Sequence, residues 1–222
     1  TIRMIFCSDV SEADFLQVIQ EQKRRRIVQV TADTLTIAPR PLAAALAANF
    51  LPACPGDWKS HLATLGVAGL TEELARRIEE LEVSEKAEEL GLLFLEEKIR
   101  FDHAEYLLSG TTSSLMFRAF AVLNPSSAAR ILKRTLGRVP LEHLTAAKDA
   151  RRNLIRAIDV MVWESSGFFE AAPVLLRLAA AENERWANNA TGEFGQLFRV
   201  ILSGTTVPAL KRLPVLRDAL AS

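Results

Sequence analysis

The polar side chains that could do chemistry gather in one stretch, residues 181–198, which reads AENERWANNATGEFGQLF. Its glutamates could act as general acids or bases, and its asparagines could hold a substrate. However, the stretch contains no serine, cysteine or histidine for these groups to activate, and no spacing typical of metal ligands. We therefore expect no catalytic site here.

The same stretch has the composition of a corner between two helices. We expect Asn188 or Asn189 to adopt the left-handed conformation that ends a helix, since asparagine tolerates it better than most residues. Thr191 is expected to cap the next helix, with Glu193 in its first turn. Asn189–Ala190–Thr191 also matches a glycosylation sequon, but we expect no signal peptide, so the match carries little weight.

Four consecutive cations, Lys23, Arg24, Arg25 and Arg26, end a predicted helix over residues 11–25 and are followed by a predicted hairpin. This order is also found at the end of a winged helix, where such cations would meet DNA phosphates. Alternatively, the cations complement the helix dipole and are solvated. Because the net charge is zero and no aromatic residues alternate with the cations, we favour the second interpretation and expect no nucleic-acid partner.

The other reactive residues stand alone. Cys7 and Cys54 are too few for a disulfide framework, which fits a reduced, cytoplasmic setting. His61, His103 and His143 have no metal-ligand spacing, so we expect surface or satisfied histidines. The sequence contains no Walker A motif, dinucleotide fingerprint, HExxH, serine elbow or kinase signature. We therefore predict no catalytic, cofactor-binding or metal-binding residue, and a chain that is not an enzyme.

The charge is unevenly distributed along the chain. Residues 1–106 contain 12 basic and 18 acidic residues, whereas residues 107–222 contain 15 basic and 9 acidic residues. We expect the two halves to attract each other or a neighbouring domain, and the alternative is a charged ligand surface. No run of about 18 apolar residues is present, so we expect no membrane span.

The hydrophobic pattern predicts a mainly α-helical protein. Ser11 is expected to cap the first helix, and the alternating segments 27–30 and 34–37 predict the hairpin. A helix led by Pro41 should follow, with Leu42, Leu46 and Phe50 as its buried stripe. The later amphipathic segments read as a stack of helix pairs, with one helix capped by Asn124, begun by Pro125 and stopped by Gly137.

We therefore predict an array of helix pairs, similar to an α-solenoid of the HEAT or TPR type, with a small winged-helix-type hairpin near the N-terminus. We divide the chain into a partial winged-helix segment (1–55), an acidic helical connector (56–106) and a helical-repeat domain (107–222).

Some segments resemble a known family. TIAPRPLAAALAANFL (36–51) resembles the segment downstream of the P-loop ATPase module in large bacterial STAND-type (NACHT-like) NTPases. FRAFAVLNPSSAARILKRTLG (117–137) and residues 150–216 are similar to the helical region that follows there. The most specific pieces are the ENE-W-NNATG-F-LF core and the closing SGT…P…RL, and the resemblance covers most of residues 27–217.

This resemblance implies a winged-helix remnant and a helical sensor region of a signalling ATPase, one that serves defence against phage. ATP and Mg are implied only for the full-length protein, because the ATP-binding motif is not in this chain. No nucleotide-contacting residue is therefore assigned. The resemblance also implies a surface that meets a partner. The candidate partner surface is the polar strip Glu182, Asn183, Arg185 and Asn188, which we expect to be exposed, and the alternative role of Asn188 is to end a helix.

Three functions compete at this stage. The first is a regulatory module that contacts other domains of the same protein, a protein trigger or further copies of itself. The second is a winged-helix transcription regulator with a helical sensing domain. The third is a helical enzyme, which would need a deep pocket that holds clustered ionisable groups.

Overall fold

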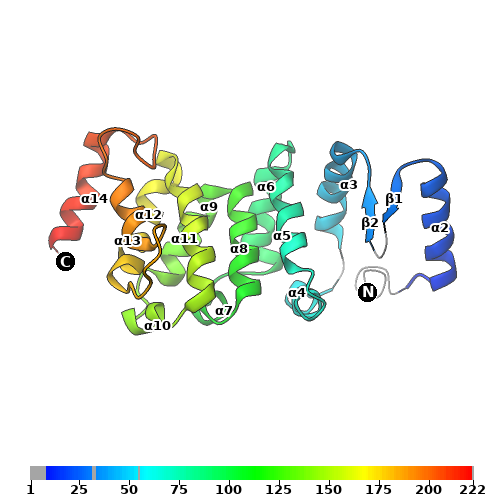
Figure 1. The fold of residues 1–222 in the computed structure, drawn as a ribbon, viewed down its shortest axis with the longest axis horizontal. Coiled ribbons are helices and arrows are strands. Elements are labelled where there is room, and N and C mark those ends of the chain that lie inside the picture. Colours follow the sequence, from blue (N-terminus) through cyan, green and yellow to red (C-terminus); the bar gives the residue numbers. More distant parts are fainter. Residues whose placement is uncertain (1–8, 32–33, 55, 222) are drawn as a thin grey trace.

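The computed structural model describes residues 9–31, 34–54 and 56–221. It confirms a mainly helical protein with one small antiparallel hairpin near the N-terminus (Figure 1). The N-terminal elements are α2 (Glu12–Arg24), β1 (Val28–Thr31), β2 (Thr34–Ile37) and α3 (Arg40–Ala53). The next elements are α4 (Trp58–Val67), α5 (Thr71–Glu79), the 3₁₀ helix η1 (Glu80–Val83), α6 (Ala87–Leu93), the π-helix η2 (Phe94–Lys98) and α7 (Ala104–Leu108). The remaining helices are α8 (Thr111–Leu123), α9 (Pro125–Leu136), α10 (Leu141–Thr145), α11 (Lys148–Val162), α12 (Ser165–Ala180), α13 (Ala190–Gln196) and α14 (Ala209–Ala221).

Local sequence signals account for several of these boundaries. The Ser11 hydroxyl accepts a hydrogen bond from the backbone N–H of Asp14 and so caps α2. Asn124 caps α9 in the same way through the backbone N–H of Ser127, and Gly137 ends that helix. The hairpin pairs Val28 with Ile37 across the two strands. These caps, the helix stop and the hairpin confirm what the sequence predicts.

The predicted buried stripe of α3 is wrong. Leu46 and Phe50 are 45% and 46% exposed, whereas Ala48 on the same helix is 3% exposed. The helix instead packs on the core through small side chains, including Ala44 and Ala47. Alanine lets a helix approach its neighbour closely, so Leu46 and Phe50 are turned outwards, whereas Leu51 still packs against the core.

The longer helices after residue 57 form two rows (Figure 1). In the first row α5 packs on α8, and α8 packs on α11. In the second row α6 contacts α9, and α9 packs on α12. The rows are joined because α8 contacts α6 and α9, and α11 contacts α12. Each inner helix is therefore held on more than one side, which agrees with the wide apolar arc of α11.

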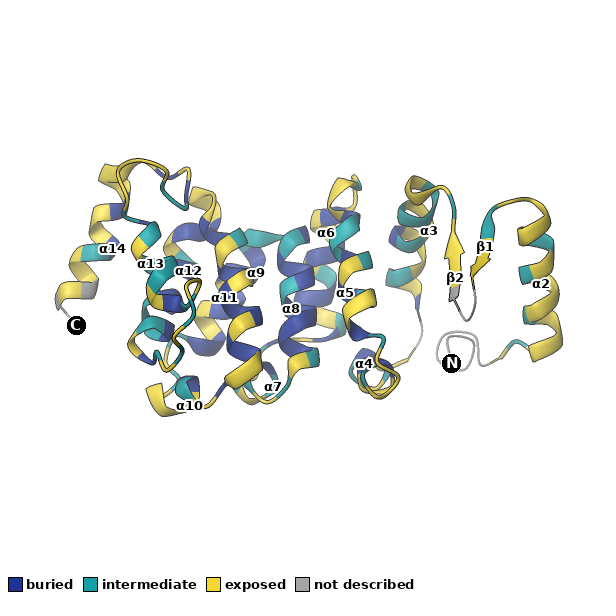
Figure 2. Cartoon of the chain, viewed as in Figure 1, coloured by how far each residue is buried: buried dark blue, intermediate teal, exposed yellow. Residues whose placement is uncertain are grey.

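One hydrophobic cluster runs between the rows from Ala48 to Val215 (Figure 2). At its N-terminal end the ring of Trp58 meets Phe94 edge-on at 4.8 Å, and Phe94 stacks on Phe120 at 4.6 Å. The cluster crosses the boundary that the sequence suggests between residues 106 and 107. The division of the chain into three parts stays a prediction.

None of the described helices is both long enough and apolar enough to cross a lipid bilayer.

Candidate interaction surfaces

A groove of about 720 Å³ crosses the first row of helices, and we name it the front groove. Three consecutive helices of that row, α5, α8 and α11, supply most of its walls. Its lining residues are Gly69, Glu72, Glu73, Arg76, Glu79, Thr111, Leu115, Arg118, Asp149, Arg152, Asn153 and Arg156. Arginines and carboxylates are equally numerous among them. A surface of this kind suits a partner with charges of both signs.

Two carboxylates of α5, those of Glu73 and Glu79, are paired with arginines of the groove. Arg76 lies 2.6 Å from Glu73, and Arg118 of α8 lies 3.0 Å from Glu79. The hydrogen bond from Arg76 is the largest cause that holds the pKa of Glu73 below its usual value. Arg152 and Arg156 on α11 form no ion pair with a carboxylate within the described ranges. Both side chains are exposed, so these two arginines are the cations of the groove that a carboxylate of a partner can reach.

The corner loop, residues 182–189, connects α12 to α13. Asn189 caps α13 by accepting from the backbone N–H of Gly192 at 2.9 Å, with Glu193 in the first turn. Thr191 therefore lies inside the helix, and its predicted role as the cap is wrong. Neither Asn188 nor Asn189 has a positive φ, so the predicted left-handed end is wrong as well. The extended conformation of Asn189, at φ −77° and ψ 171°, is the usual one for a capping asparagine.

Glu182 is not the exposed residue that the sequence suggests, because its side chain is only 14% exposed. Its carboxylate lies 3.2 Å from Nη2 of Arg151, a side chain with no exposed surface. It also accepts hydrogen bonds from the backbone N–H groups of Asn183, Glu184 and Thr191. Glu182 therefore holds the corner loop together from inside.

The other three residues of the candidate partner surface, Asn183, Arg185 and Asn188, are exposed. Asn183 donates a side-chain hydrogen bond to the carbonyl of Thr145 at 2.9 Å, which fixes the loop on the end of α10. The guanidinium of Arg152 lies over the ring of Trp186, 5.3 Å from its centre. Because Arg152 lines the front groove and Trp186 belongs to the corner loop, the two surfaces are adjacent. The role of the exposed residues in binding a partner stays a prediction.

The N-terminal cations occupy the place that the sequence predicts. Lys23 and Arg24 lie in the last turn of α2, and all four residues are exposed. Arg25 pairs with Glu21 one turn earlier at 2.5 Å. Arg26 follows with a φ of 61° and leads into β1. Their contact with phosphate or DNA stays untested.

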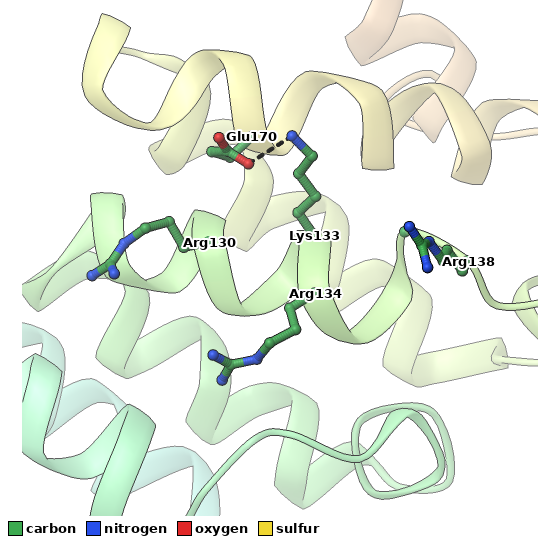
Figure 3. Close-up of a pocket in the computed structure, with 6 residues that line it drawn as sticks. Arg130, Lys133, Arg134, Arg138 and Glu170 are labelled. Carbon is green, nitrogen blue, oxygen red and sulfur yellow. Dashed lines mark ion pairs between the residues drawn. The ribbon is translucent and has the colours of Figure 1, made fainter.

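A second hollow, of about 490 Å³, lies over α9 and α12, and we name it the basic pocket (Figure 3). It is lined by Arg130, Lys133, Arg134, Gly137, Arg138 and Glu170. Lys133 points across to Glu170 of α12 at 2.8 Å, and the described residues include no ion pair for the three arginines. The pocket therefore holds four cations and one carboxylate.

Two carboxylates with raised pKa values lie where α11 meets α13. Asp159 stays exposed at the edge of α11, but partial burial of its carboxyl group raises its pKa. Burial also raises the pKa of Glu193, and the charge of Asp159 adds to that effect, while Arg199 opposes it. Both carboxyl groups are therefore protonated more easily in the folded state than in the unfolded chain.

We expect Asp159→Asn to stabilise the protein at neutral pH. A carboxyl group whose pKa is higher in the folded state than in the unfolded chain lowers the free energy of unfolding at high pH. This loss develops as the pH rises from the pKa of the unfolded chain through the pKa of the folded state. The neutral amide removes that cost, so the midpoint of thermal unfolding should rise by about 2 °C at pH 7. The difference should vanish at pH 3, where both states are protonated. Equal midpoints of variant and wild type at pH 7 would contradict this assignment.

Arg151 and the front groove have no local signal in the sequence, because their partners come from distant helices. The basic pocket had a local signal, since the segment from Ala128 to Arg138 contains cations and no acidic residue. In the part of the chain that the structure describes, no three His, Cys, Asp or Glu side chains gather as metal ligands would. No family model, curated protein or solved structure matches this chain.

Proposed function

We propose that this chain is a regulatory helical region of a multidomain bacterial signalling ATPase of the kind that defends against phage, and that it acts through protein–protein contacts. The observation that carries the proposal is the front groove, where Arg152 and Arg156 face outwards beside arginines that are already paired. Two rows of helices support reading the fold as an array of helix pairs of the α-solenoid type. The resemblance of residues 36–51, 117–137 and 150–216 to STAND-type NTPases supplies the class of protein.

In this proposal the front groove and the exposed part of the corner loop form one surface. It holds another domain of the same protein in an inactive arrangement, and a protein trigger competes for it. A trigger can shift such an equilibrium only by the difference between its affinities for the two arrangements. The surface suits this role because Arg76 and Arg118 are held in ion pairs, whereas Arg152 and Arg156 can pair with carboxylates of either the inhibitory domain or the trigger.

The first test is to sequence the reading frame upstream of Thr1. A GxxxxGK[ST] motif there supports the proposal, and its absence from the whole reading frame would contradict it. The chain alone should release no phosphate from ATP, because the ATPase module lies outside it. ATP hydrolysis that co-purifies with this chain over successive chromatography steps would also contradict the proposal.

The second test uses the full-length protein with Arg152→Glu and Arg156→Glu together. Charge reversal should weaken the inactive arrangement, so basal ATP turnover should rise by about fivefold or more, the lower range of measured couplings between sites. Lys211→Glu, an exposed reversal on α14, is the matched control and should leave turnover unchanged. A double variant with wild-type turnover would argue against the front groove as the regulatory surface.

The alternative function is a winged-helix transcription regulator. It is favoured by the exposed cations at the end of α2, directly before the hairpin. A gel-shift assay with mixed-sequence duplex DNA separates the two functions. We expect no binding, whereas a shift that weakens steeply with salt and is lost in Lys23→Ala/Arg24→Ala would support the alternative.

A further inference from the structure

We infer that the basic pocket binds a compact phosphate-bearing anion, either a free phosphorylated metabolite or a phosphorylated side chain of a protein. This inference does not depend on the proposed function, because it concerns the second row of helices and not the front groove. It rests on the charge balance of the pocket, the spacing of its arginines and the contacts that position two of its cations.

The charge balance of the pocket differs from that of α5. On α5, Arg76 and Arg77 are both paired with Glu73 and Glu80, at distances of 2.6 to 3.0 Å. On α9 and the turn after it, by contrast, four cations line the pocket with one carboxylate, that of Glu170, and only Lys133 pairs with it (Figure 3). Like charges held close together destabilise the fold unless an anion offsets them. The pocket is therefore a place where an anion would be stabilising.

The arginines of the pocket are spaced along α9 and the turn after it. Arg130 and Arg134 are one helical turn apart, so they leave α9 on the same side about 6 Å apart along the axis. In Figure 3 the guanidinium of Arg134 points away from Lys133 and Glu170, and Arg138 lies in the turn beyond the helix. Guanidinium groups present N–H donors in a planar fork that matches phosphate oxygens.

Two of the cations are already positioned by neighbours. Nη2 of Arg130 donates to the hydroxyl of Ser127 at 2.8 Å, and Ser127 is only 3% exposed. Lys133 is held by Glu170, but both side chains are more than one third exposed. An exposed pair of this kind contributes little to stability, so an anion could take over Lys133.

The neutral total charge favours a compact ligand over a long polyanion. At physiological salt the field of exposed charges decays within about 8 Å, which is roughly the size of the pocket. A single phosphate group would be attracted by the cations of the pocket alone. A nucleic acid is longer and would also be repelled by the acidic residues of the segment 72–97. We therefore assign the pocket to a phosphate group rather than to nucleic acid.

The test is isothermal titration calorimetry at low salt with pyrophosphate, a short phosphoserine peptide, its unphosphorylated form and a single-stranded oligonucleotide. We expect wild-type protein to bind pyrophosphate or the phosphopeptide, and Arg134→Ala/Arg138→Ala to weaken that binding about tenfold or more. These side chains are exposed, and an unchanged thermal midpoint would show that the variant is folded. Lys23→Ala/Arg24→Ala removes the same charge from α2 and should change the affinity less than twofold.

A further variant separates a binding role from a structural one. Glu170→Gln removes the carboxylate that would repel the ligand and frees Lys133, so it should tighten binding about threefold. A role in folding alone would not produce tighter binding. Pyrophosphate binding without phosphopeptide binding would assign a free metabolite, and preference for the phosphopeptide over its unphosphorylated form would assign a protein partner.

Several results would overturn the inference. The first is no binding of pyrophosphate or the phosphopeptide at ligand concentrations of about 10 millimolar. The second is that Lys23→Ala/Arg24→Ala weakens binding as much as Arg134→Ala/Arg138→Ala does, and the third is that Glu170→Gln does not tighten binding. The fourth is that the oligonucleotide binds more tightly than both phosphate ligands.

Discussion

Arg151→Met is expected to lower the free energy of unfolding by about 3–5 kcal/mol, the usual cost of breaking a buried ion pair from one side. The Arg151 side chain has no exposed surface and joins three parts of the chain. It pairs with Glu182, donates to the carbonyl of Leu144 at 3.3 Å and also donates to the carbonyl of Leu178. The methionine would fill the space but leave a buried carboxylate and two carbonyls without these donors.

The measurement is urea unfolding followed by circular dichroism. Arg156→Met, on the exposed face of the same helix, is the matched control and should change the free energy by less than about 0.5 kcal/mol. The double variant Arg151→Met/Glu182→Gln should recover part of the loss, because it removes the stranded charge. A loss below about 1 kcal/mol for Arg151→Met would mean that the corner loop does not depend on this pair.

Phe94→Ala should produce the second large effect, a loss of about 3–5 kcal/mol. The Phe94 ring is fully buried between Trp58 and Phe120, so its removal leaves a cavity that rigid rings on both sides cannot fill. Leu92→Ala, two residues earlier and 40% exposed, is the control and should cost less than about 1.5 kcal/mol.

The same variant tests the predicted division at residues 106 and 107. Phe94 lies before the division and Phe120 after it, and the two rings are in direct contact. If the parts form one cooperative unit, calorimetry should show a single transition that moves to lower temperature in Phe94→Ala. Two transitions, of which only the first moves, would instead support a separate connector.

The sequence predicted those features of the fold that depend on neighbouring residues. Ser11, Asn124 and Gly137 mark helix ends through contacts within four residues, and the hairpin follows from local alternation. Prediction failed where a distant contact decides the outcome. Glu182 was placed at the surface because its neighbours are polar, whereas Arg151, 31 positions earlier, draws it inwards.

The buried face of α3 could not be predicted from the sequence either. The pattern of α3 offers two apolar faces, one with Leu46 and Phe50 and one rich in alanine. Large side chains bury more area, which favoured the first face, but the neighbouring helices accept the smaller one. The candidate site was also predictable only in part. The sequence indicates the exposed asparagines of the corner loop, whereas the front groove forms only when three helices pack together.

Arg151 belongs to a set of arginines whose forked ends reach backbone carbonyls of other segments. The set and its acceptors are Arg151 with Leu144 and Leu178, Arg177 with Val139, and Arg212 with Leu197 and Arg199. Arg151 reaches its two carbonyls with different nitrogens, Nη1 and Nη2. A lysine would keep the charge, but its single ammonium cannot span two separated oxygens as a planar guanidinium does. As this lineage diverges, arginine should therefore persist at position 151, while arginines on the open surface exchange freely with lysine.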